Sequence, residues 1–180
     1  MPATTLAEAL AAAGSSAEEV VTEREPIQAI SIICSKGTLD MAYPGLILAN
    51  AARMSGIEAT LFFTFWGLKA IQKGNTTGKG LFGRMLGVMN RGGIDRIGPS
   101  RFNFGGMGRW MFKKMMGVQN VATLPEMLQM AIDLDVKLLA CEMSRDVMGI
   151  SDEELMDGLE PAGVASFLGE SLTSRTNLFI

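Results

Sequence analysis

Three short apolar segments, alternating along the chain with segments of helical periodicity, constrain the fold most. They are residues 27–34 (IQAISIIC), 57–65 (IEATLFFTF) and 136–141 (VKLLAC). Each is apolar at most consecutive positions, as expected of a strand that is covered on both faces. Helical patterns occupy 41–56 and 123–135 between them. Strands that alternate with helices predict an α/β fold, flavodoxin-like and doubly wound, with a mainly parallel sheet and helices on both faces.

Local signals mark where some of these elements begin and end. Thr123 followed by Glu126 predicts a capping box at the start of a helix. Ser151 followed by Glu154 predicts a second capping box. The last residues, 176–180 (TNLFI), predict a short final strand.

Composition excludes several classes of function. The 180 residues carry a net charge of −3 and contain no histidine. The acidic balance argues against a nucleic-acid partner, and the missing histidine removes the commonest general base and metal ligand. We therefore expect no metal and no cofactor. The chain has neither a signal-peptide pattern nor an uncharged apolar stretch of about 18 residues, so we expect a cytoplasmic protein.

The domain organisation follows from shifts in composition. Residues 1–26 predict an acidic N-terminal extension, and 27–180 predict one α/β domain. An insert at 74–118 holds 12 of the 21 glycines, 6 of the 14 methionines, and eight basic residues against one acid. It is interpreted as a structural insert packed on the sheet or on a neighbouring subunit, as a peripheral membrane segment at 81–118, or as a docking platform for a protein partner. Its apolar side chains predict a homo-oligomer.

The two cysteines are the candidate reactive groups. Cys34 and Cys141 each occupy the last position of a predicted strand, and such ends share the sheet edge where ligands bind. Cys141 also precedes a predicted helix start near Ser144, which would stabilise an accessible thiolate. In a flavodoxin-like strand order the two strands are neighbours, about 5 Å apart, and the two sulfurs face one pocket. The alternative is that both are ordinary buried cysteines.

The loop after the first strand is a candidate anion site. In the sequence SKGTLD (35–40), Gly37 permits a tight turn, and Ser35, Lys36 and Thr38 offer donors to an anion. The order of residues does not match a phosphate-binding Walker loop. The alternative is an ordinary turn between a strand and a helix.

The segments ISIICSKGTLDMAYPGLILANAARMSGIEATLFFTFWGL, VKLLACEMSRDVMGI, EELMDGLEPAGVASFL and NLFI resemble the DsrE/DsrF-like family, in particular its larger, methionine-rich branch that is often labelled peroxiredoxin-like. The likeness covers nearly all of 27–180, and its specific motifs are the pattern A-C-x-x-S-x-x-x-x-G-I at 140–150 together with the loop SKGTLD at 35–40. The resemblance implies a flavodoxin-like sandwich that forms oligomers. It also implies a sulfur-relay role in which Cys141 holds the persulfide.

The function expected from these observations is that of a cysteine-dependent persulfide carrier or sulfurtransferase in a sulfur-relay or thiol-redox pathway. Cys141 would be the nucleophile, with Ser144 and Lys36 stabilising the anionic sulfur. Cys34 would resolve the persulfide by forming a disulfide if the two Cα atoms lie within about 7 Å. A sulfur carrier or a disulfide reductase would be the partner. The alternatives are a small-ligand or nucleotide-binding module and a non-catalytic scaffold subunit of an oligomer.

Overall fold

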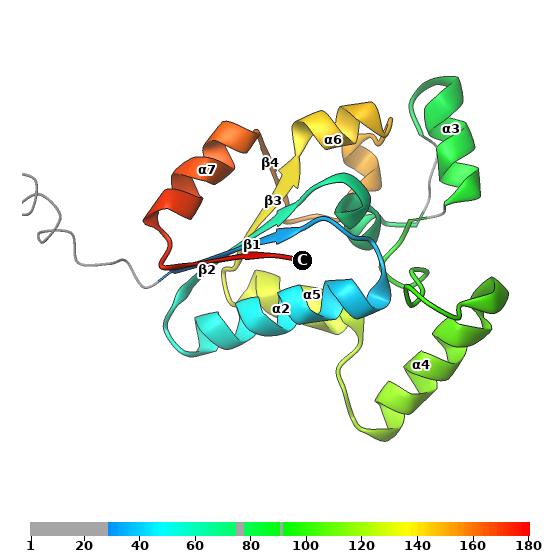
Figure 1. The fold of residues 1–180 in the computed structure, drawn as a ribbon, viewed down its shortest axis with the longest axis horizontal. Helices are drawn as coiled ribbons and strands as arrows, with labels where there is room; N and C mark the ends of the chain where they lie inside the picture. The colour runs from blue at the N-terminus through cyan, green and yellow to red at the C-terminus, as the bar shows by residue number, and fades with distance from the viewer. Residues whose placement is uncertain (1–28, 75–77, 91) are drawn as a thin grey trace, which may run out of the picture.

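The structure is a computed structural model that describes residues 29–74, 78–90 and 92–180. Five strands form one parallel sheet with the order β4-β3-β2-β1-β5 (Figure 1). They are β1 Ala29–Cys34, β2 Glu58–Phe63, β3 Lys137–Cys141, β4 Glu160–Ala162 and β5 Thr176–Phe179. The predicted α/β class with a parallel sheet is confirmed. The predicted N-terminal extension, 1–26, lies outside the described residues.

Helices cover both faces of this sheet, as the uniformly apolar strands predict. Figure 1 shows α2 and α5 on one face and α6 and α7 on the other. The helices are α2 Leu39–Met54, α3 Gly80–Met89, α4 Met107–Val118, α5 Leu124–Asp133, α6 Glu142–Val147 and α7 Val164–Thr173. Three 3-10 helices complete the described elements: η1 Phe65–Ile71, η2 Phe104–Gly106 and η3 Asp152–Glu154.

The strand order and the register separate the two cysteines. Strand β2 lies between β1 and β3, so the predicted neighbourhood of β1 and β3 is wrong. Cys34 is in register with Phe63, which is in register with Ala140, so these three side chains lie on the same face. Cys141 comes one residue later and therefore points to the opposite face, because side chains alternate along a strand.

One of the two predicted capping boxes is present. Thr123 caps α5, and its N–H donates to the Glu126 carboxylate at 2.7 Å. The second is wrong: Ser151 precedes only the short η3, and the Glu154 side chain turns inward, where it is 4% exposed. It accepts hydrogen bonds from Gln72 Nε2 at 3.3 Å and from the Gly78 N–H at 2.6 Å. Tertiary partners have replaced the local cap.

The turn after β1 packs directly on η1 at the carboxyl edge of the sheet. The Gly67 N–H donates to the Ser35 carbonyl at 3.1 Å. A Cβ atom at Gly67 would lie 2.0 Å from the Cys34 carbonyl oxygen, and one at Gly37 would lie 2.1 Å from the Trp66 carbonyl oxygen. Only glycine permits this approach of two backbones, which brings the loop at 35–38 against η1.

Candidate functional site

A chain of polar side chains ends on the Cys141 sulfur. Cys141 is the last residue of β3 and the N-cap of α6. The Ser144 hydroxyl, one turn into α6, donates to Cys141 Sγ at 3.3 Å. The Thr64 hydroxyl, at the carboxyl end of β2, lies 2.9 Å from Ser144 Oγ. Because Ser144 donates to the sulfur, Thr64 is left as the donor to Ser144, and the chain of donors is directed at the thiol.

The Cys141 side chain is enclosed, so the expectation of an accessible thiol is wrong for this conformation. Cys141 is 1% exposed and packs in a cluster with Phe62, Leu139, Ala162 and Phe167. The rings of Phe62 and Phe167 are stacked with their centroids 4.6 Å apart. Phe167 belongs to α7, so this helix supplies part of the cover over the sulfur.

The charged neighbours of Cys141 point away from it. Glu142 and Asp146 are exposed on the outer side of α6. Arg145 is paired with Asp152 and, at 3.4 Å, with Asp146. Among the described side chains, the hydroxyl of Ser144 is the one that donates a hydrogen bond to the sulfur.

Cys34 occupies a separate place on the opposite face. It is 3% exposed, and a Cβ at Gly45 of α2 would lie 2.9 Å from its Sγ. Burial raises the pKa of Cys34 to about 12, so the thiol stays protonated at neutral pH. Two strand spacings put the Cα atoms of Cys34 and Cys141 about 10 Å apart or more, beyond the reach of a disulfide. The predicted shared pocket and the resolving role of Cys34 are wrong.

The residues predicted to bind an anion lie in two places, and the cavity that Lys36 lines does not include Cys141. Lys36, Gly37 and Thr38 line a cavity of about 220 Å³ beside η1. The Ser35 hydroxyl is instead used in the fold, where it donates to the Ile180 carbonyl at 2.9 Å. Ser144 lies with Cys141 and is not part of this cavity.

Two residues of these sites were missed from the sequence. Thr64 completes the hydroxyl chain to Cys141, and its only signal was a polar residue near the end of the predicted strand at 57–65. Lys69 lines the cavity with Lys36 and is 3% exposed. Its signal was a single charge inside the otherwise apolar stretch FWGLKAI.

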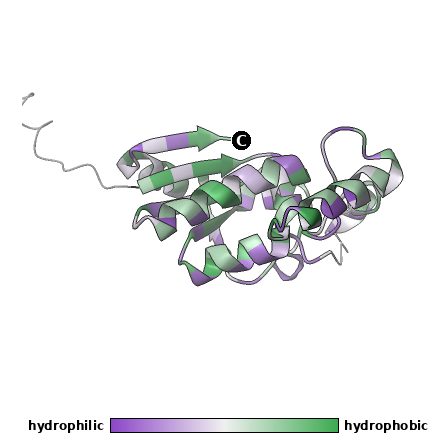
Figure 2. Ribbon diagram, turned by 90° about the horizontal axis from the view of Figure 1, so that it is seen from below, coloured by the Kyte–Doolittle hydropathy of each residue, from purple (hydrophilic) through white to green (hydrophobic). Residues whose placement is uncertain are grey.

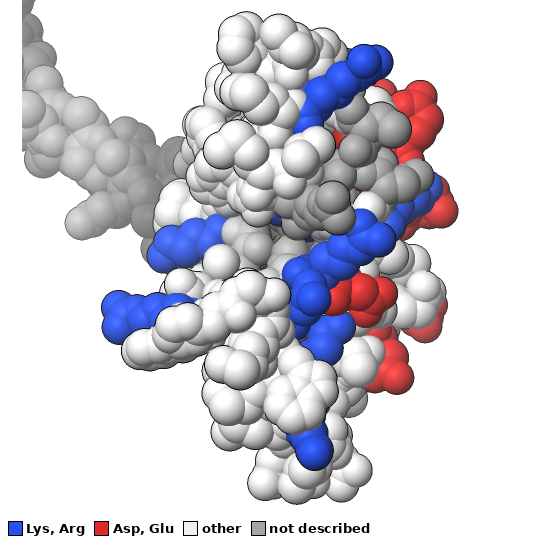
Figure 3. All heavy atoms as spheres, turned by 90° about the vertical axis from the view of Figure 1, so that its right-hand side faces the viewer, with Lys and Arg blue, Asp and Glu red and all other residues white. Residues whose placement is uncertain are grey.

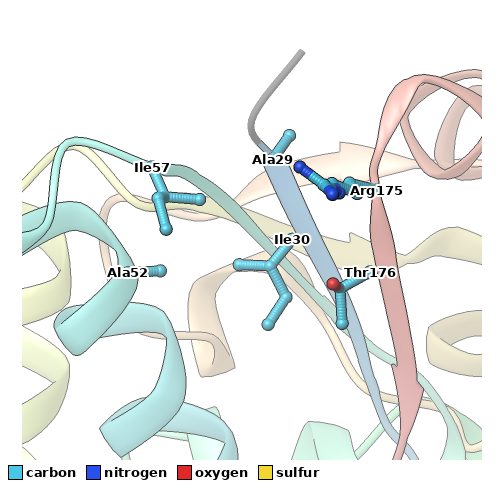
Figure 4. Close-up of a pocket in the computed structure, with 6 residues that line it drawn as sticks. All are labelled: Ala29, Ile30, Ala52, Ile57, Arg175 and Thr176. Carbon is cyan, nitrogen blue, oxygen red and sulfur yellow. The ribbon is translucent and has the colours of Figure 1, made fainter. Parts of the chain in front are cut away.

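Two cavities are larger than the one beside η1, and neither is lined by a cysteine. One of about 300 Å³ lies at the amino ends of β1 and β5, opposite the carboxyl edge, and is lined by apolar side chains with Arg175 and Thr176 (Figure 4). Another of about 320 Å³ lies beside β4, between Ala140, Glu142 and Pro161. The Ala140 side chain lies on the face of the sheet opposite to Cys141, so this second cavity does not reach the Cys141 sulfur.

Helices α3 and α4 leave the body of the domain beyond the carboxyl edge of the sheet (Figure 1). Hydrophobic and hydrophilic residues are mixed on the helices at the right of Figure 2, and Figure 3 shows Lys and Arg side chains spread over this side of the molecule. We call their large exposed apolar residues the α3–α4 surface: Leu81, Phe82, Met85, Val88, Met89, Met107, Trp110, Met111, Phe112, Met115 and Val118.

The exposure of the α3–α4 surface overturns one interpretation of the insert. Packing of these side chains on the sheet is wrong, since only Leu86 and Met116 of the two helices reach the core. Contact with a second copy, with a partner protein or with a membrane surface stays a prediction. Among the described helices, none is both long and apolar enough to cross a membrane. The described side chains also contain no group of three or more His, Cys, Asp or Glu placed to hold a metal ion.

Comparisons with known proteins agree with this architecture. Residues 27–179 match the model of the DsrE/DsrF/DrsH-like family. YrkE of Bacillus subtilis is 39% identical over 158 residues, which cover 87% of this chain and 99% of YrkE. The sulfur carrier protein DsrE2 of Allochromatium vinosum is 35% identical over 149 residues, which cover 79% of this chain and 93% of DsrE2.

The fold is also that of a solved structure. The ychN protein of E. coli superimposes with a TM-score of 0.54 at 18% identity, over 85% of this chain and 99% of ychN. The family match covers every described strand and both cysteines. The chain therefore belongs to the DsrE/DsrF/DrsH-like family.

Proposed function

We propose that this protein carries sulfur in a relay and that Cys141 holds the transferred sulfur as a persulfide. The name of the DsrE2 relative supports the sulfur-relay role. The observation that carries the choice of residue is the hydrogen bond from Ser144 Oγ to Cys141 Sγ. Cys34 is the poorer candidate because its thiol has no comparable donor among the described residues and its pKa is raised to about 12.

The transfer needs no redox partner. The Cys141 thiolate attacks the outer sulfur of a donor persulfide, R–S–SH. A new S–S bond forms to Cys141, the donor S–S bond breaks, and the electron pair leaves with the donor as R–S⁻. An acceptor thiolate reverses these roles in the second step, so the oxidation level of the pair of sulfur atoms is conserved.

Ser144 has a defined part in this chemistry. A hydroxyl that donates to an anionic sulfur stabilises the attacking thiolate, and the Thr64 hydroxyl behind it holds Ser144 in the donating orientation. A hydrogen bond to a charged group contributes about 1.5–3 kcal/mol. We expect Ser144→Ala to slow persulfide loading of Cys141 by about tenfold or more for this reason. Single-turnover loading followed by quenched mass spectrometry checks the rate.

Access to the sulfur must come from a movement of its cover. Phe167 is the residue that α7 contributes to the small cluster around Cys141, and this cluster is separate from the main core on the other face. Few buried contacts favour local opening. A donor would reach Cys141 when α7 lifts at this point.

The experiment is intact-mass measurement after incubation with a small persulfide donor. Wild type and Cys34→Ser should each gain the mass of one sulfur, and Cys141→Ser should gain none. The two variants are matched because each replaces one buried strand-end thiol by a hydroxyl. Loading that persists in Cys141→Ser would refute the assignment.

A further inference from the structure

The cavity beside η1 contains a buried positive charge that the sulfur chemistry does not use. It has a volume of about 220 Å³ and lies between the loop after β1, the start of η1 and the end of α3. Its lining includes Lys36, Thr38, Trp66, Lys69 and Asn90. Lys36 and the half-exposed Trp66 form its outer part, and Lys69 its inner part.

Lys69 is held in place by tight packing of its stem. A Cβ at Gly37 would lie 3.0 Å from Lys69 Cβ, and one at Gly92 would lie 3.0 Å from Lys69 Cδ. The side chain is 3% exposed, and within the described ranges its ammonium group donates no hydrogen bond and forms no ion pair. Burial lowers the pKa of Lys69, and the charge of Glu154 opposes that shift in part. A buried ammonium without a close partner is costly.

Two acids next to residues of this cavity, Asp40 beside Ser100 and Glu154 beside Lys69, already accept hydrogen bonds from other donors. The Asp40 carboxylate accepts from the Ser100 N–H at 2.8 Å and from the Ser100 hydroxyl at 2.6 Å. The Glu154 carboxylate accepts from Gln72 and from the Gly78 N–H. The two lysines therefore give the cavity a positive character that an external anion can neutralise.

We propose that this cavity binds a small anionic ligand, with Lys69 as its principal charge partner, Lys36 at the mouth and the Trp66 side chain as an apolar wall. The anionic group is a carboxylate or an oxyanion, both of which accept hydrogen bonds from ammonium groups. The site does not rest on sulfur carriage by Cys141. Cys141 points to the other face of the sheet, so either activity can be absent while the other remains.

The test uses Trp66 as the reporter in the full chain. Trp110→Phe removes the second of the two tryptophans, which lies outside the cavity on α4. The fluorescence of Trp66 is then titrated with acetate, phosphate and thiosulfate at constant ionic strength, with chloride as the balancing salt. We expect a saturable change with at least one of the three anions. The anion that saturates at the lowest concentration shows whether the site prefers a carboxylate or an oxyanion.

Lysine variants in the same background assign the charge partner. Lys69→Met should raise the dissociation constant by about tenfold or more, since a charged hydrogen bond is lost. Lys73→Met should change it by less than about twofold, because Lys73 does not line the cavity and pairs with Asp157 at 2.8 Å.

Folding of the Lys69 variant is checked by its thermal melt. Methionine replaces a buried charge with an apolar chain of similar length, so its melting temperature should match or exceed that of the parent. Lys69→Gln serves the same test if the methionine variant fails to fold. No saturable response to any of the three anions, or equal affinity in parent and Lys69 variant, would overturn the proposal.

Discussion

Replacing Phe167 by alanine is expected to speed alkylation of Cys141 by roughly a hundredfold. The Phe167 ring stacks on Phe62 and belongs to the cluster that encloses the sulfur. Its removal should lower the free energy needed to open the cover by about 3 kcal/mol of lost packing. Each 1.4 kcal/mol by which that free energy falls raises the alkylation rate about tenfold. Alkylation with iodoacetamide, quenched at set times and followed by peptide mass spectrometry, gives the alkylation rate of each cysteine separately.

The control for Phe167 lies on the same helix. Leu172 of α7 is 78% exposed, so Leu172→Ala should leave the Cys141 alkylation rate within about twofold of wild type. Cys34 should stay slow in both variants because α2, not α7, covers it. If Phe167→Ala accelerates Cys34 as much as Cys141, global unfolding is the cause and α7 is not the local cover.

Gly67→Ala is expected to destabilise the fold by about 3 kcal/mol. The new methyl group would lie 2.0 Å from the Cys34 carbonyl oxygen, and a backbone atom cannot move aside as a flexible side-chain end can. The loop after β1 would be pushed from η1, which also separates Lys36 from Lys69 in the cavity. Urea unfolding followed by circular dichroism gives the free energy of unfolding.

Gly169→Ala is the matched control. Gly169 lies inside α7, and a Cβ there would meet nothing within 4 Å. Alanine favours a helix over glycine, so this variant should be more stable than wild type by about 0.5–1 kcal/mol. Equal stability of Gly67→Ala and wild type would show that the contact between the loop and η1 is loose in solution.

Local patterns were sufficient for most of the fold. The segments that form β1, β2 and β3 can be predicted because each is a short run of apolar residues. The Thr123 capping box can be predicted because both of its residues lie within one helical turn. Strand β4 was missed because its three residues, Glu160–Ala162, include a charge and a proline and show no strand pattern. Their pairing with β3 depends on the whole sheet.

The site was predicted only as far as local spacing reaches. Cys141 and Ser144 are three residues apart at a helix start, so their contact follows from sequence. Thr64 and Lys69 reach their sites through tertiary packing, which no local pattern reports. The two cysteines are apart for two reasons that the sequence does not report. Strand β2 lies between their strands. Side chains alternate along β3, so a shift of one residue moves a side chain to the other face of the sheet.

The most direct test of the account is to locate the transferred sulfur in the wild-type chain. Wild type is loaded with a persulfide donor, the persulfide is trapped by alkylation, and the digested peptides are sequenced by mass spectrometry. The peptide that contains Cys141 should carry the additional sulfur, and the peptide that contains Cys34 should carry none. Additional sulfur on Cys34, with Cys141 unmodified, would contradict the account.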